Sequence, residues 1–109
     1  MTALEIVREA RAKIERGWCK GRLAQNAEGM GCAPSSAEAV AWCLRGALCA
    51  EEYSYGCIQA MDAVVRELPR WACERIPLFN DAGGTYLEDV LDVLSRAERI
   101  LLEEKDGGE

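Results

Sequence analysis

The stretch AWCLRGALCA, residues 41–50, constrains the fold more than any other part of the chain. In it and the four residues before it, only Glu38 and Arg45 are charged, and most other side chains are small. A helix that is apolar nearly all round is a central one, and small side chains let neighbouring backbones approach closely. We therefore expect a buried helix, with Gly46 where another helix leaves no room for a methyl group and Cys43 as a space-filling side chain.

Helix starts are indicated at three places, where a hydroxyl residue stands three positions before a glutamate and an apolar-periodic run follows. This spacing is typical of a capping box, in which the two side chains satisfy each other's backbone amides. The pairs are Thr2 with Glu5, Ser35 with Glu38, and Thr85 with Glu88. Together with Pro69, which ends one run, they predict four main helices, over residues 2–16, 35–52, 54–68 and 85–104.

No strand pattern with alternating polarity stands out, so the predicted fold class is all-α: a compact bundle of four main helices around the buried Ala/Cys-rich second helix. Residues 1–104 are expected to form a single helical domain and residues 105–109 a flexible acidic tail. Residues 20–34 read as a long loop, and a short helical turn is expected through Trp71 and Cys73.

Charge and cysteine usage narrow the classes of function. The formal net charge is −6, so a nucleic-acid partner is not expected, because an acidic surface repels phosphate. The N-terminus is charged from its fifth residue and no apolar run is long enough for a membrane span, which predicts a cytoplasmic protein without a membrane partner. Six cysteines in that compartment are expected to be reduced thiols.

Catalytic chemistry is limited by the absence of histidine from the whole sequence. Nucleophile–histidine machinery and histidine-ligated metals are thereby excluded. The cysteines are spaced too widely for a chelating pair, so no structural zinc is expected. No catalytic residues, resident metal or cofactor are predicted.

Six residues are candidates for a binding site, each with a structural alternative. Asn80 and Asp81 precede a predicted helix. Asp81 could bind a divalent cation weakly together with Asp89 or Asp92. The structural alternative is an Asx-type turn in which Asn80 or Asp81 bonds the nearby backbone and Thr85 caps the helix. Trp18 and Trp71 could stack on a ligand or anchor a partner, although packing against the core is the preferred interpretation of both. The remaining two candidates are Cys43 and Arg45, which lie on different faces of the predicted second helix.

The chain resembles a family of small, uncharacterised bacterial and phage proteins with a domain of unknown function. The resemblance spans nearly the whole chain and rests on Gly17-Trp18 with Gly21, Cys43-Leu44-Arg45-Gly46-Ala47-Leu48, Asn80-Asp81, and Thr85 with Glu88-Asp89-Val90. Members often have tryptophan where this chain has Phe79. The resemblance implies a small helical domain and no particular activity.

Two functions remain open from the sequence. The favoured one is a non-enzymatic module that binds a protein partner or forms a homo-oligomer, because the chain has an acidic surface, no catalytic constellation and aromatic residues near helix ends. The alternative is an enzyme or a small-ligand or metal-binding protein with a site near Asn80, Asp81 and Cys43, joined by Trp18 and Arg45.

Overall fold

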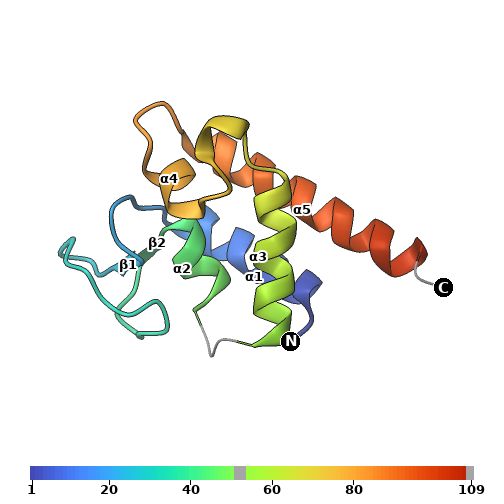
Figure 1. Cartoon of the computed structure of the whole chain (residues 1–109). Helices are drawn as coiled ribbons and strands as arrows, with labels where there is room; N and C mark the ends of the chain where they lie inside the picture. The colour runs from blue at the N-terminus through green and yellow to red at the C-terminus, as the bar shows by residue number, and fades with distance from the viewer. Residues whose placement is uncertain (51–53, 108–109) are drawn as a thin grey trace.

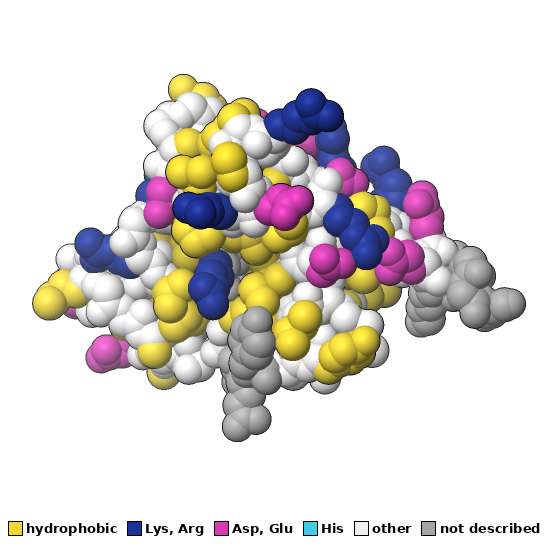
Figure 2. All heavy atoms as spheres, in the orientation of Figure 1, with side chains coloured by type: hydrophobic (Ala, Val, Ile, Leu, Met, Phe, Trp, Pro, Cys, Tyr) yellow, Lys and Arg dark blue, Asp and Glu magenta, His cyan; other side chains and the backbone are white. Residues whose placement is uncertain are grey.

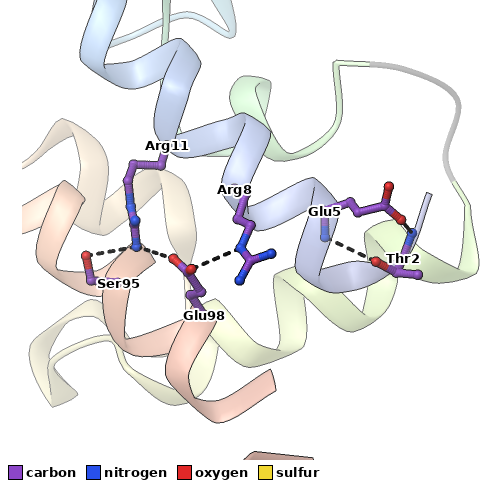
Figure 3. Close-up of polar contacts among 6 residues, drawn as sticks. All are labelled: Thr2, Glu5, Arg8, Arg11, Ser95 and Glu98. Atoms are coloured by element: carbon purple, nitrogen blue, oxygen red, sulfur yellow. Dashed lines mark hydrogen bonds and ion pairs between the residues drawn. The ribbon is translucent and has the colours of Figure 1, made fainter. Parts of the chain in front are cut away.

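The N-terminal helix α1 (Ala3–Arg16) is the element around which the others pack. It begins as predicted: the Thr2 hydroxyl accepts from the Glu5 amide and the Glu5 carboxylate accepts from the Thr2 amide, which completes a capping box (Figure 3). Its buried face contacts α2, α3 and α5. The central element is therefore α1 and not the second predicted helix.

A computed structural model describes residues 1–50 and 54–107 of the chain. In these residues it shows five α-helices, three of them long, and a small antiparallel sheet of two strands (Figure 1). The elements after α1 are β1 (Ala24–Gln25), β2 (Ala41–Trp42), α2 (Leu44–Leu48), α3 (Tyr55–Arg66), a 3-10 turn (Arg70–Ala72), α4 (Ile76–Asp81) and α5 (Leu87–Gly107). The all-helical prediction is thus corrected by the sheet, whereas the turn near Trp71 is confirmed.

Helix α5 packs along α1 and is held there by an ionic cluster (Figure 3). Arg8 and Arg11 of α1 both pair with Glu98 of α5, and Arg11 also donates to the Ser95 hydroxyl at 3.0 Å. Glu98 is largely shielded from solvent, so this cluster is screened less than a fully exposed pair. It sets the register of the two long helices.

The predicted second helix over residues 35–52 is wrong in its first half. Residues 34–35 and 37–38 form turns, with the Ser36 hydroxyl accepting from the Glu38 amide, and the predicted cap at Ser35 is absent. Strand β2 follows, and α2 has only five residues. The end of the predicted helix, at Glu52, lies outside the described residues, as does Tyr53.

Strand β2 forms because its backbone finds partners on both sides. On one side the Trp42 amide donates to Gly17 O at 3.0 Å, and on the other the Cys43 amide donates to Leu23 O at 3.1 Å. The Trp42 ring is buried, with its Nε1 donating to Pro34 O at 2.9 Å. These partners lie far away in the sequence, so local helix propensity is overridden.

Two glycines permit this close approach. A Cβ atom on Gly17 would collide with the carbonyl oxygen of Val40, and one on Gly46 with that of Leu23. The expectation that Gly46 has no room for a methyl group is confirmed, but its neighbour is the loop before β1 and not a helix.

Residues 76–81, which lie between the predicted turn near Trp71 and the predicted helix from residue 85, form an additional helix, α4, which has Pro77 in its first turn. Helix α5 begins at Leu87, one residue later than a cap at Thr85 would predict. The Tyr86 amide donates to the Asp89 carboxylate at 2.8 Å, and the buried Thr85 hydroxyl has no hydrogen-bond partner among the described residues. Thr85 is therefore not the helix cap.

The expectation that all six cysteines are reduced is also corrected. Cys49 and Cys57 are joined by a disulfide that links the end of α2 to the first turn of α3, with Cα atoms 6.2 Å apart. The other four are free thiols: Cys19, Cys32, Cys43 and Cys73.

Gly46→Ala is expected to lower the free energy of unfolding by about 2–3 kcal/mol, because the new methyl group meets a backbone carbonyl that cannot rotate away. Urea unfolding measures the change. Gly83→Ala is the matched control, since its Cβ would meet nothing within 4 Å, and its effect should stay within about 0.5 kcal/mol. Equal effects of the two substitutions would contradict the close contact.

Candidate functional site

The side-chain amide of Asn80, on α4, is fully buried and joins three segments of the chain. Its Oδ1 accepts from Trp18 Nε1 at 2.7 Å and from the Leu44 amide at 3.0 Å. Its Nδ2 donates to Cys19 O at 3.1 Å and to Asp81 Oδ1 at 2.9 Å. Both acceptor positions and both donor hydrogens are thereby used.

Neighbouring contacts extend this network to the chain after α1. Asp81 Oδ1 also accepts from the Gly21 amide at 2.9 Å, and Gly21 has a positive φ of 80° that favours glycine. Lys20 Nζ donates to the carbonyl oxygens of Ala82 and Thr85 at 2.6 and 2.9 Å. We call residues 18–21, Leu44, Asn80 and Asp81 the Asn80 network.

Cys43 stands beside this network as the N-cap of α2, where its sulfur accepts from the Gly46 amide at 3.3 Å. Burial raises the pKa of the Cys43 thiol. Burial, followed by the proximity of Cys43, raises the pKa of the Cys19 thiol to about 11. Both thiols are therefore protonated at neutral pH and are poor nucleophiles.

The structure thus brings four of the six candidate residues together: Trp18, Cys43, Asn80 and Asp81. The side chains of these residues make hydrogen bonds within the protein, so few of their donors and acceptors remain for a ligand. In residues 1–50 and 54–104, no group of three or more His, Cys, Asp or Glu side chains could hold a metal ion. The arrangement is a structural connection between α4, α2 and the chain that follows α1.

Arg45, the fifth candidate, leads to a different feature. It is the one exposed residue of α2 and lines a groove of about 840 Å³ between α2, α3 and α4. Figure 2 shows hydrophobic side chains gathered at the centre of the view, with charged side chains among them. We call this groove the α3–α4 groove; its side chains are Arg45, Ile58, Met61, Asp62, Val65, Glu74, Arg75, Ile76, Pro77, Leu78, Asp81 and Ala82.

The groove exists because α3 has two apolar faces. One face, made of small side chains such as Ala60 and Ala63, is buried against the core. The other carries Ile58, Met61 and Val65, which are spaced three and four residues apart and so form one stripe. Ile58 remains 45% exposed. Met61 and Val65 are half-buried against the core, and all three side chains line the groove.

Charged side chains frame the groove. Arg45 and Arg75 have no ion-pair partner within residues 1–50 and 54–104, and Asp62 pairs with Arg66 outside the groove at 2.9 Å. Cys73 and Glu74, just before α4, adopt positive φ angles of 52° and 60°. Such angles are uncommon for residues other than glycine and are often retained at functional positions.

Trp71, the sixth candidate, lies away from the Asn80 network. It is 53% exposed and its ring centroid is 6.1 Å from that of buried Phe79. It borders a separate, more polar depression of about 620 Å³ beside the start of α5. Trp71 is therefore not a core residue, and it does not belong to the same site as Asn80.

Sequence reasoning missed the groove residues on α3 and α4, most clearly Ile58, Met61 and Leu78. A signal was present, because apolar residues occupy more of the α3 sequence than one buried face needs. The spacing of Ile58, Met61 and Val65 is typical of a buried helix face, but Ile58 is 45% exposed.

Asn80→Asp is expected to lower the free energy of unfolding by about 3 kcal/mol or more at neutral pH, because it removes the donor to Cys19 O and buries a charge beside Asp81. Part of the loss should return in acid, where the introduced carboxyl becomes neutral. Asp81→Asn is the control: its oxygen can still accept from Gly21, so a change within about 1 kcal/mol is expected. Urea unfolding at two pH values measures both.

Iodoacetamide at pH 8 is expected to label exposed Cys73 in the native protein and to leave Cys19 and Cys43 unlabelled, as mass spectrometry of peptides would show. Because the folded pKa of Cys19 lies above its unfolded value, its contribution to stability is complete below about pH 9 and is lost as the pH rises toward 11. Cys19→Ala should remove this part of the pH dependence. Rapid native labelling of Cys43 would contradict the packing role.

Within the described residues, no helix is long and apolar enough to cross a membrane. No curated protein and no solved structure matches the sequence significantly. One family model matches residues 1–100, nearly the whole chain. The protein therefore belongs to a family of unknown function, DUF6197.

Proposed function

We propose that this protein is a non-enzymatic interaction module that docks another protein surface in the α3–α4 groove. The observation that supports it best is the second apolar face of α3. A monomeric protein gains nothing from leaving such a stripe in water, since burying each aliphatic side chain is worth about 1.5–3 kcal/mol. Exposed apolar patches of this kind are typical of interaction sites.

The occupant we propose is a protein surface with aliphatic side chains framed by charges of both signs. The groove is lined by aliphatic side chains and, at its margin, by charged ones. Protein interfaces share this arrangement of an apolar centre and a polar rim. Arginines without an internal ion pair, as at Arg45 and Arg75, are common anchors in such interfaces.

The alternative, an enzyme or ligand site near Asn80, Asp81 and Cys43, has less support. The Asn80 amide is fully hydrogen-bonded, and the nearby thiols have raised pKa values. A thermal-shift screen with Mg²⁺, Ca²⁺, Mn²⁺ and Zn²⁺ distinguishes the two functions. A melting temperature raised by one of these ions, and abolished by Asp81→Asn, would favour the alternative.

A double substitution, Ile58→Ser with Leu78→Ser, is expected to remove binding while leaving the fold intact, because both side chains are 45% exposed. The tagged wild-type and variant proteins are compared by quantitative mass spectrometry of the proteins they retain from a lysate of the source cells, including untagged copies of the chain itself. The expected result is that the variant loses what the wild-type protein retains.

The matched control replaces Met30 and Tyr86, which are both 65% exposed and lie outside the groove, by serine. It should retain the same proteins as the wild type. The proposed function would be contradicted if all three proteins retained the same partners. It would also be contradicted if the control lost the same partners as the Ile58/Leu78 variant.

A further inference from the structure

The charges at the margin of the groove are separated by sign. Asp62 and Glu74 also line the next depression beside the end of α3, which places them at that edge of the groove. Arg66 and Arg70 line that depression as well, but they do not line the groove. We call Asp62 and Glu74 the acidic rim. Arg45 on α2 and Arg75 at the start of α4 form the basic rim. Figure 2 shows charged side chains of both signs around the hydrophobic area, with Lys and Arg on both sides of it.

Asp81 is the remaining charged residue that lines the groove, and it belongs to neither rim. Asp81 uses its Oδ1 to accept from the Gly21 amide and from Asn80 Nδ2. Its Oδ1 is therefore engaged within the Asn80 network. The rims themselves have two arginines on one side and two carboxylates on the other, and of these four residues Asp62 already pairs with Arg66 at 2.9 Å.

A surface of this kind is complementary to itself. In a two-fold symmetric dimer, the same patch on both copies meets across an axis that lies in the plane of contact. If the axis runs between the rims, the rotation carries the basic rim of one copy onto the acidic rim of its partner. The same rotation places the two apolar stripes face to face, where Ile58 and Leu78 lose their remaining exposure to water.

We infer that the occupant of the α3–α4 groove is a second copy of this chain, bound groove to groove about a two-fold axis with each basic rim against the partner's acidic rim. This inference rests on the proposed function and names the partner. Repulsion from the net charge of −6 on each copy opposes association. The local pairing of opposite rims offsets it and fixes the orientation.

Charge reversal provides a test that only this arrangement passes. The first variant combines Arg45→Glu with Arg75→Glu, which makes both rims acidic. The second combines Asp62→Lys with Glu74→Lys, which makes both rims basic. Three of the four residues make no ion pair with described residues, and the Asp62–Arg66 pair is an exposed one of small value, so both variants are expected to fold.

Sedimentation equilibrium is then measured from low to high micromolar concentration. The wild-type protein should shift from its chain mass of 12.0 kDa toward twice that value. Each variant alone should bind itself at least about tenfold more weakly. An equimolar mixture of the two should recover association, because every rim then faces the opposite charge.

Three results would overturn the inference: a wild-type protein that stays at 12.0 kDa, a variant that dimerises as strongly as the wild type, or a mixture that does not associate. These outcomes leave the proposed function separately testable. A monomeric protein whose retained partners still depend on Ile58 and Leu78 would keep the interaction module and reject the second copy as its occupant.

Discussion

The buried amide of Asn80 is the interaction on which the rest of the structure depends. It connects α4 to the chain after α1 and to the first turn of α2 through four hydrogen bonds. In a low-dielectric interior a fully satisfied polar group specifies one arrangement, because any other arrangement leaves buried donors and acceptors unpaired. α4 is short, and this connection fixes where it lies and therefore where one wall of the groove stands.

The motifs that carry the resemblance to the family find a common explanation here. Trp18, Gly21 and the Asn80-Asp81 pair take part in one network. Gly17 and Gly46 let the β2 segment and α2 approach their neighbours, and Lys20 holds the Thr85 carbonyl. These residues are required by the packing of short elements that have little regular hydrogen bonding of their own. The groove is built from other positions on top of that scaffold.

The two regions have opposite physical characters. In the Asn80 network the polar groups of the Asn80 amide are buried and hydrogen-bonded within the protein, so these hydrogen bonds contribute to folding and not to binding. In the α3–α4 groove Ile58 and Leu78 are exposed, and the arginines Arg45 and Arg75 have no ion pair with described residues, so association could still bury apolar surface and pair these charges. The disulfide between Cys49 and Cys57 links α2 to α3, the two elements beside which the groove opens.

The sequence by itself determined the long helices α1, α3 and α5, because apolar periodicity is a local signal, whereas the capping box correctly marked only the start of α1. It also determined that Gly46 is confined and that histidine-dependent chemistry is absent. Only the tertiary structure decided that residues 41–42 are a strand and that residues 76–81 are a helix, since the backbone partners of the strand and the side-chain partners of Asn80 lie far along the chain. It also decided which apolar stripe of α3 faces the core. Periodicity shows that a face is apolar, but neighbouring elements determine whether anything covers it.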